Sequence, residues 1–432
     1  MTDTPKTQQN QSSLQAWVVC LVGALYFFYI FIQMTKFNAI GQQLMSDFRM
    51  NSAGLGTLSS IFFWGDVLFL FPAGLILDRY SIKKSLLLMM VVVIVCTFAF
   101  SLTHSLTFAS WCFFFTGIAG AFGLMVPLRL ASHWFPAEKM ALVSGLSVTI
   151  GFLGAMVSQS PLTWLVGVVG WRHAMQWDAG LGILFFVMFL LVIKDSPVEI
   201  KKEVTVENKQ MLRSLWGSIK HTIVNRQNWL FGIYTCLLNM PIFILGAVFG
   251  VNYLQQVQHL TIAQASFANV LLFAGAMAGS PFFGWFSDKM KRRKFPMYVG
   301  GIVTLILLLT LMYGSWNYMV IYALFTAIGF FTSAQVITYP VIAESNFPEN
   351  IATGFGMGSS LIMSGGAFLI PLFGILLQSQ WDKKILNGMP WHSVSDYRFA
   401  LWMLPISAII GMIAIKFGKE TKCKSIVVSN DT

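Results

Sequence analysis

The chain has 432 residues, of which 56% are hydrophobic and only 10% are charged. Soluble globular proteins carry charge on about a quarter of their residues, so this composition excludes a large soluble domain and indicates a protein that crosses the membrane several times. Lys and Arg outnumber Asp and Glu by 28 to 17, and the places where these charges fall decide what the excess means.

Twelve apolar runs follow one another along the chain, each near the length of about 20 residues that a helix needs to cross the hydrocarbon. We therefore predict an all-α membrane protein with two six-helix halves. The runs lie at 16–34, 55–77, 86–103, 107–132, 140–166, 179–193, 229–251, 264–286, 296–313, 317–342, 353–377 and 399–415. The predicted domains are a polar tail at 1–15, the first half at 16–193, a linker at 194–228, the second half at 229–415 and a tail at 416–432.

The basic residues gather in the connections on one side of this predicted bundle. If the N-terminus is cytoplasmic, 21 of the 28 Lys and Arg lie in cytoplasmic segments, and six, Lys36 among them, lie in outer connections. Basic segments are retained on the cytoplasmic side, so we expect both termini in the cytoplasm and the chain in the inner or plasma membrane. The retention of basic connections in the cytoplasm accounts for the net positive charge. We therefore expect no nucleic-acid partner. The five cysteines show no paired spacing, so we expect no disulfide framework and no metal site.

Two cytoplasmic connections repeat each other at an offset of 210 residues. The chain reads GLILDRYSIKK from Gly74 and GWFSDKMKRRK from Gly284, and Gly65 and Gly275 match at the same offset. Charge retention alone explains the basic residues but not an Asp four positions after a Gly in both copies. An acid there can lie at the positive N-terminal end of a neighbouring helix, while the cations contact lipid headgroups.

This repeated loop resembles the signature loop of the major facilitator superfamily, whose members have two six-helix halves. The first copy departs from the family pattern at Ser81 and Ile82, and the second is the fuller one. Further matches are Arg129 with Trp134-Phe135-Pro136, Gly170-Trp171-Arg172, and Phe347-Pro348. The chain is also similar to bacterial branches that include organic-anion symporters, nutrient transporters of intracellular pathogens and relatives of lysosomal dipeptide carriers. The resemblance implies a transporter that works by alternating access.

The two loops are predicted to form a conformational latch between the halves. Pro136 and Pro348 suit the first turns of the fifth and eleventh helices, and these helix starts lie on the same side as the loop aspartates. We expect Asp78 to face the start of the eleventh helix and Asp288 the start of the fifth. The predicted latch residues are Gly74, Asp78, Arg79, Gly284, Asp288, Lys289 and Arg292.

Two charged residues inside the runs are candidates for the transport path. Asp66 lies twelve residues before Asp78, which puts it about 18 Å from the cytoplasmic boundary at helical rise. If the carrier is driven by protons, Asp66 is the predicted coupling group, because desolvation favours its neutral form; the alternative is a structural acid beside Gly65. Arg129 lies five residues from Trp134, so it either serves the path or extends to the interface.

The uncharged candidates lie on the first, seventh and tenth helices. The superfamily resemblance implies that these helices and the fourth line the path. Tyr and Gln near the ends of spans also occur at the membrane interface, which is the alternative for Gln33. The candidates are Tyr26, Tyr29, Gln33, Tyr234, Asn239, Gln335 and Tyr339.

These observations favour a secondary transporter of a small polar metabolite, such as an amino acid or short peptide. Related carriers often have an Arg near Gln33, and its absence disfavours a strongly anionic substrate. The alternatives are a drug or metabolite efflux carrier and an organic-anion symporter. The sequence has no Gly-x-x-x-x-Gly-Lys loop, no His-Glu-x-x-His and no Gly-x-Ser-x-Gly, so we expect neither an ATP-driven pump nor an enzyme. The expected partners are the solute, lipids and, for a symporter, protons, with no cofactor and a monomeric state.

Overall fold

A computed structural model describes residues 6–135, 137–195, 220–347, 350–382, 384–386 and 389–425. The side chains of residues 6–13, 78, 137, 138, 140, 141, 352, 386 and 389 are not described. Most of the predicted linker at 194–228, and the end of the predicted tail at 416–432, lie outside the described residues.

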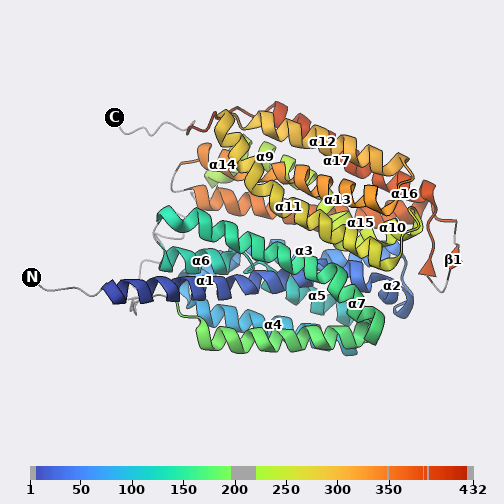
Figure 1. The fold of residues 1–432 in the computed structure, drawn as a ribbon, viewed down its shortest axis with the longest axis horizontal. Helices are drawn as coiled ribbons and strands as arrows, with labels where there is room; N and C mark the ends of the chain where they lie inside the picture. Colours follow the sequence, from blue (N-terminus) through green and yellow to red (C-terminus); the bar gives the residue numbers. More distant parts are fainter. Residues whose placement is uncertain are drawn as a thin grey trace, which may run out of the picture.

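The first half of the described chain is helical throughout, as its apolar composition predicts. Its helices run side by side along the long axis of the molecule in Figure 1, coloured blue to green. They are α1 (Lys6–Thr35), α2 (Phe37–Asp47), α3 (Ser52–Arg79), α4 (Ile82–Leu102), α5 (Leu106–Gly120), α6 (Met125–Trp134) and α7 (Ala137–Val192).

The second half adds two irregular helices and a short hairpin. The helices are α9 (Arg226–Leu238), the π-helix η1 (Ile242–Phe249), α10 (Gly250–Gln256), α11 (Ile262–Met290), α12 (Lys294–Tyr313), α13 (Tyr318–Thr332), the 3-10 helix η2 (Ser333–Ile337), α14 (Thr338–Glu344), α15 (Ile351–Ser379), α16 (Val394–Leu401) and α17 (Met403–Lys416). Strands β1 (Ile385–Leu386) and β2 (Met389–Pro390) pair antiparallel, with Ile385 opposite Pro390.

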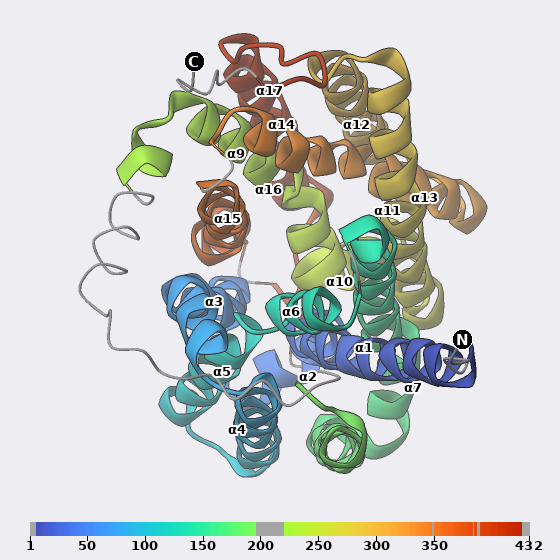
Figure 2. The ribbon, with the colours of Figure 1, turned by 90° about the vertical axis from the view of Figure 1, so that its left-hand side faces the viewer.

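The two halves lie against each other as two bundles. In the end-on view of Figure 2 the helices up to α7 occupy one side and those from α9 onward occupy the other, apart from α7, which reaches across to α11. We call the end of the molecule that carries the β1–β2 hairpin the hairpin end, and the opposite end, where α1 begins and α17 ends, the tail end (Figure 1).

Ten helices among the described residues are long and apolar enough to cross a membrane, and a bent pair formed by α9 with η1 and α10 raises the number to eleven. One of the ten, Leu142–Val192, is 51 residues long. It contains Gly170, whose φ of 78° is not helical. Apart from the short β1–β2 hairpin, the described chain is therefore helical, with helices that can span a membrane, as predicted.

Glycines let the helices of each half approach closely at equivalent places. A Cβ at Gly65 of α3 would collide with the carbonyl oxygen of Phe114 in α5, and a Cβ at Gly117 of α5 would collide with that of Phe62. Small residues at such crossings allow backbone contact between membrane helices.

The second half repeats this crossing between α11 and α13. A Cβ at Gly275 would collide with the carbonyl oxygen of Thr326, and one at Gly329 with that of Leu272. Because Gly65 and Gly275 are 210 residues apart, the sequence repeat corresponds to a structural one.

We predict that Gly275→Val destabilises the protein by about 1–3 kcal/mol, because the added methyl groups force two backbones apart. Gly167→Val is the matched control, since Gly167 is an exposed helical glycine whose Cβ would have no atom within 4 Å. Thermal unfolding in detergent, followed by tryptophan fluorescence, measures both. Equal melting temperatures for the two variants would contradict the prediction.

Candidate functional site

Six hydrogen bonds join the two halves among the described residues, and all lie at or near the hairpin end. The strongest set belongs to Asn38 of α2, whose side chain is 5% exposed. Its Nδ2 donates to the carbonyl oxygens of Leu245 at 2.9 Å and Gly246 at 2.6 Å, and its Oδ1 accepts from the backbone N–H of Val251 at 3.2 Å. One amide thus bridges the irregular backbone where η1 changes into α10.

The sequence makes this backbone irregular. Pro241 is the N-cap of η1, and π-helical turns are rare and occur mostly at functional sites. At the return to α-helix, a Cβ at Gly250 would collide with the Leu245 carbonyl oxygen. The glycine therefore permits the geometry that offers carbonyls to Asn38.

Three side-chain pairs complete the contact between the halves: Gln42 with Gln255, Ser52 with His392, and Ser160 with Ser266. We call these pairs, together with the Asn38 bonds to η1 and α10, the clasp. The Ser52 Oγ and His392 Nε2 atoms are 2.7 Å apart. Aromatic pairs that also cross between the halves, Phe63 with Phe243 at 4.9 Å and Trp64 with Phe368 at 4.7 Å between ring centroids, add apolar contact. The described hydrogen bonds thus close the molecule at its hairpin end.

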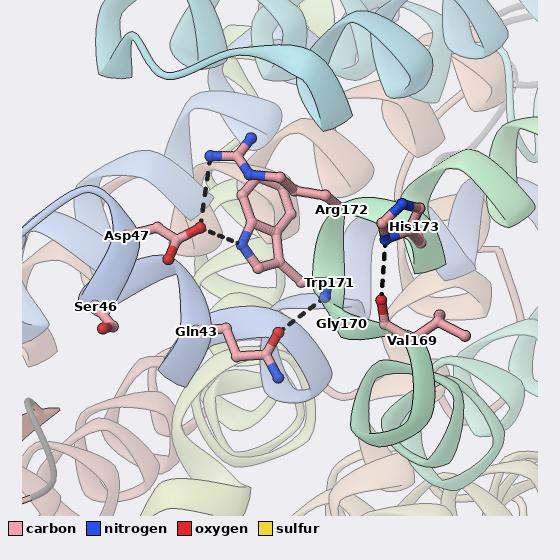
Figure 3. Close-up of a pocket in the computed structure, with 8 residues that line it drawn as sticks. All are labelled: Gln43, Ser46, Asp47, Val169, Gly170, Trp171, Arg172 and His173. Carbon is pink, nitrogen blue, oxygen red and sulfur yellow. Dashed lines mark hydrogen bonds and ion pairs between the residues drawn. The ribbon is translucent and has the colours of Figure 1, made fainter.

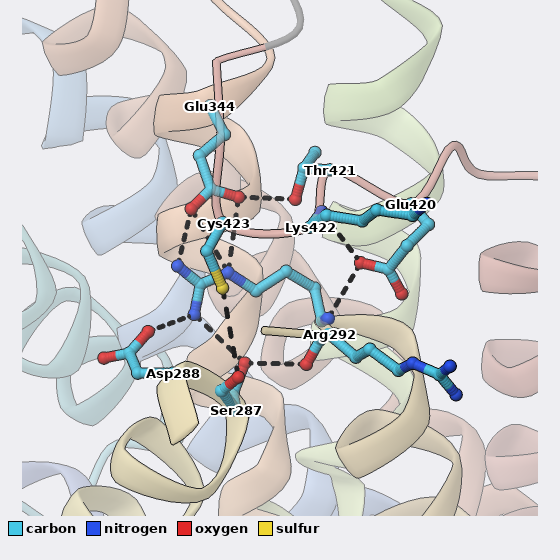
Figure 4. Close-up of polar contacts among 9 residues, drawn as sticks. Ser287, Asp288, Arg292, Glu344, Glu420, Thr421, Lys422 and Cys423 are labelled. Atoms are coloured by element: carbon cyan, nitrogen blue, oxygen red, sulfur yellow. Dashed lines mark hydrogen bonds and ion pairs between the residues drawn. The ribbon is translucent and has the colours of Figure 1, made fainter. Parts of the chain in front are cut away.

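At the tail end the polar contacts between described residues stay within one half or the other, and those of the second half form a network around Arg293. Asp288 Oδ1 lies 2.6 Å from Arg293 Nη1, and Arg293 also binds Glu344 of α14. Burial alone would lower the pKa of Arg293. The hydrogen bonds to Glu344 and Asp288 and the charge of Glu344 have the larger effect and raise this pKa. Figure 4 shows these residues with the segment after α17, from which Glu420 accepts the backbone N–H of Arg293 at 2.8 Å.

Of the two predicted latch aspartates, only Asp288 has a described side chain, so only its predicted contact can be checked against the structure. Its carboxylate contacts its own half here, and the side chains of Asp78 and of residues 137 and 138 lie outside the described ones. Contact between Asp288 and the start of α7 stays a prediction for a state closed at the tail end. Of the other predicted latch residues, Lys289 lies over the Trp285 ring, and Arg79 and Arg292 are exposed. A Cβ added at Gly284 would meet no atom within 4 Å, and one at Gly74 would meet the Met125 sulfur at 4.0 Å.

The predicted tyrosines satisfy backbone groups inside their own halves. The hydroxyl of Tyr26 donates to the Ala119 carbonyl at 2.8 Å, that of Tyr29 to the Asp178 carbonyl at 3.0 Å, and that of Tyr234 to the Met297 carbonyl at 2.7 Å. All three side chains are completely buried. They pin helix to helix and present no free group to a solute.

The structure moves Lys36 from the predicted outer connection into the protein interior, where it is 1% exposed. Its Nζ donates to Gln33 Oε1 at 2.6 Å, and Gln33 Nε2 donates to Asp178 Oδ2 at 2.8 Å. We call these three residues the charge triad. Sequence reasoning missed Asp178, because it stands just before the apolar run at 179–193. The three-residue spacing of Gln33 and Lys36, one helical turn apart in the sequence, was the available signal.

Asp66 lies in α3 and is 5% exposed. Its Oδ1 atom has no hydrogen-bond partner, and Asp66 forms no ion pair with Arg129 or any other described residue. Arg129 therefore does not hold Asp66 in its charged form through an ion pair in this structure.

The predicted residues of the second half meet where two helices are broken. Asn239 caps α9 just before η1, and Gln335 lies in the 3-10 turn η2. Gln335 Nε2 donates to Asn239 Oδ1 at 2.6 Å, and Thr235 Oγ1 donates to Gln335 Oε1 at 3.2 Å. Close by in the chain, the Tyr339 hydroxyl contacts Ser359 Oγ at 3.2 Å. These five polar side chains carry no charge.

A surface pocket of about 340 Å³ lies where α2 ends beside the Gly170 turn. Figure 3 shows Asp47 accepting the Trp171 Nε1 hydrogen at 2.8 Å and facing Arg172 at 3.5 Å. The Gly170-Trp171-Arg172 motif thus ties the clasp helix α2 to the break in α7.

We predict that acid weakens closure at the hairpin end. Burial lowers the pKa of His392 from 6.5 to about 4, although Asp396 and Asp382 act in the opposite direction. Well above pH 6.5 the imidazole ring is neutral in both the closed and the open state. As the pH falls from 6.5 toward 4, the solvated ring of the open state takes up a proton, whereas the buried ring of the closed state stays neutral, so the open state is favoured. At pH 5 this disfavours closure by about 30-fold relative to pH 7.5.

Spin labels at His104→Cys and Ser315→Cys measure this effect, because both positions are exposed, lie at the hairpin end and belong to opposite halves. The distance between these two labels, the hairpin-end pair, should lengthen as the pH falls. His392→Gln keeps a hydrogen-bonding amide for Ser52 and should remove most of the pH response. An unchanged response in that variant would contradict the prediction.

Comparison with known proteins agrees with this geometry. The family model described as Major Facilitator Superfamily matches residues 21–371 and 231–425. The chain is 22% identical to the probable galactarate/D-glucarate transporter GudP of Escherichia coli over 69% of this chain and 73% of that protein. It is 23% identical to the lysosomal dipeptide transporter MFSD1 of Danio rerio over 78% of this chain and 76% of that protein.

Solved structures show the same fold. A bacterial homologue of the human lysosomal transporter Spinster, inward-facing and unoccupied, superposes with a TM-score of 0.75 at 17% identity, covering 93% of this chain and 96% of that one. The nucleoside transporter NupG superposes with a TM-score of 0.69 at 13% identity, covering 92% and 99%. The chain belongs to the Major Facilitator Superfamily and is a transporter, not an enzyme.

Proposed function

We propose that this protein is a secondary transporter that moves a small polar metabolite, such as an amino acid or short peptide, by alternating access. The observation that carries the substrate assignment is the uncharged amide pair of Asn239 and Gln335, which lies at two helix breaks. Transporters of several folds place their binding sites at discontinuous helices near the bilayer midplane.

The polar groups of this site suit a solute that both donates and accepts hydrogen bonds. Gln335 and Tyr339 are partly exposed although they belong to a membrane-spanning helix. On the facing half, the rings of Phe27, Phe31 and Phe152 follow one another at centroid distances of 4.7 Å and 5.6 Å. The uncharged amide pair, together with this aromatic cluster of the first half, suits a neutral or zwitterionic solute with an apolar part.

Lys36 gives no support to an anion site, because its ammonium group is already bonded within the charge triad. An organic-anion symporter remains the alternative that the similarity to the sugar-acid transporter GudP favours, whereas the similarity to the dipeptide transporter MFSD1 favours a peptide. A drug or metabolite efflux carrier is the other alternative.

We further propose twelve membrane spans in a monomer, with the tail end in the cytoplasm. Counting Leu142–Val192 as two spans that meet at Gly170, and α9 with η1 and α10 as one, gives that number. The excess of Lys and Arg in the tail-end connections supports this orientation in the inner or plasma membrane. The clasp then closes the outer face.

A thermal-shift screen of the purified protein tests the substrate class, because a ligand that binds only the folded state stabilises it by about 2.7 kcal/mol at 100 times its Kd. The panel contains amino acids, dipeptides, nucleosides, galactarate and D-glucarate. We expect a rise in Tm with an amino acid or dipeptide. A rise with the sugar acids alone would replace our proposal by the organic-anion symporter.

We predict that Gln335→Ala removes the ligand-induced rise in Tm, because the broken-helix site loses its central amide. Ser364→Ala is the matched control, since among the described residues the Ser364 hydroxyl donates to the Ser360 carbonyl of its own helix. Retention of the full rise in Gln335→Ala would place the binding site elsewhere.

We predict that Asp66→Asn abolishes accumulation driven by a pH gradient and leaves substrate exchange intact. The Asn side chain mimics the protonated acid, so the carrier can still reorient but no longer takes up a proton at this position. Exchange and accumulation of the ligand found in the screen are measured in the same proteoliposomes. Continued accumulation in response to the gradient would show that Asp66 is not the coupling site.

A further inference from the structure

We propose that the charge triad of Lys36, Gln33 and Asp178 is a second proton-sensitive element, which controls whether the clasp is closed. In this assignment Asp178 is a positioning residue: its charge holds Lys36, and Lys36 holds the helix that carries Asn38. The proposal rests on the proposed function only in treating closure at the hairpin end as one state of a transport cycle.

The triad places a buried ammonium group and a buried carboxyl group on either side of one amide, which joins them without a direct salt bridge. Gln33 receives the ammonium hydrogen on its Oε1 and gives its Nε2 hydrogen to the carboxylate, and Thr97 Oγ1 also donates to Gln33 Oε1 at 3.1 Å. The exposed fractions are 1% for Lys36 and 6% for Asp178. Within the triad, Lys36 donates to Gln33 and Gln33 donates to Asp178, so each hydrogen bond is donated from the side of the cation toward the side of the anion.

The remaining neighbours of Lys36 cannot replace the carboxylate. Its Nζ lies 5.7 Å and 5.4 Å from the ring centroids of Phe100 and Phe113, and the other titratable groups that face the triad are the thiols of Cys96 and Cys112 and the hydroxyl of Tyr29. Among the described residues Asp178 is thus the anion that balances Lys36. Removal of one partner of a buried ion pair leaves an uncompensated charge, which is strongly destabilising.

The position of Lys36 in the chain connects this charge balance to the clasp. Lys36 is the single residue between α1 and α2, and Asn38 follows two residues later. Just before it, the Thr35 hydroxyl contacts Ser158 of α7. A displacement of Lys36 toward water therefore carries α2, and with it the Asn38 amide, away from η1.

The sequence of events needs only one proton. A proton from solution binds a carboxylate oxygen of Asp178 and makes the acid neutral. The ammonium group of Lys36 then lacks its counter-charge between two phenyl rings. It regains solvation if α2 moves and the clasp opens, so protonation of Asp178 favours opening of the hairpin end.

The hairpin-end label pair tests this proposal without any substrate. The full-length protein in lipid nanodiscs is studied at pH 7.5, where His392 is neutral. Protein without the introduced cysteines provides the background from native thiols. Asp178→Asn retains an oxygen that can accept the Gln33 hydrogen bond but removes the charge, so we expect the population with long label distances to increase about tenfold or more.

A second variant separates charge balance from damage to the fold. Lys36→Met combined with Asp178→Asn has no buried charge, so its hairpin end should be closed again, as in the parent. Asp178→Glu should also stay closed. A closed hairpin end in Asp178→Asn alone, or an open one in the double variant, would overturn the proposal.

A pH titration shows that the effect involves a proton. In a His392→Gln background, which removes the other acid-sensitive group of the clasp, the parent should open as the pH falls. The profile of the double variant should be flat. Equal pH profiles for the two proteins would also overturn the proposal, whereas failure of every substrate prediction would leave this test unchanged.

Discussion

The hydrogen bonds between the Asn38 amide and the backbone around η1 are the contact on which the observed arrangement of the two halves depends. In hydrocarbon, every backbone polar group must find a partner within the protein. A helix that leaves regular geometry therefore needs a side chain to satisfy its carbonyls, and here that side chain comes from the opposite half. The same bonds satisfy a helix and join two bundles, so they can be broken only when another partner, such as water in an open gate, replaces them.

The buried charges follow the same constraint. Lys36 and Asp178 compensate each other inside the first half, whereas Asp66 has an oxygen without a partner. A compensated pair is stable only while both members are charged, and a lone buried acid is stable only when neutral. In the mechanism that we propose, protonation acts oppositely on the two sites, because it removes the charge of the buried Asp66 but leaves the charge of Lys36 without its counter-charge. In this proposal, one proton-dependent element neutralises the transport path and another releases the clasp.

The sequence predicted those features that depend on the spacing of residues along the chain. The 210-residue repeat placed Gly65 and Gly275 at equivalent crossings, because close helix contact requires glycine at a fixed place in each half. The amides of Asn239 and Gln335 were predicted as polar groups inside spans, but their bond depends on two helix breaks that periodicity does not reveal. Lys36 was assigned to a connection because its partner Asp178 is distant in the chain. Tyr26 and Tyr234 were predicted to line the path because the sequence does not show which backbone carbonyls their hydroxyls reach.

The central claim is that closure at the hairpin end alternates with closure at the tail end. Distances from two label pairs test it most directly: the hairpin-end pair, and a tail-end pair at Lys139→Cys and Lys289→Cys, which are exposed and lie in opposite halves. Measured in the same nanodiscs under conditions that open the clasp, the tail-end distance should shorten in proportion as the hairpin-end distance lengthens. A tail-end distance that stays constant while the hairpin end opens would contradict alternating access.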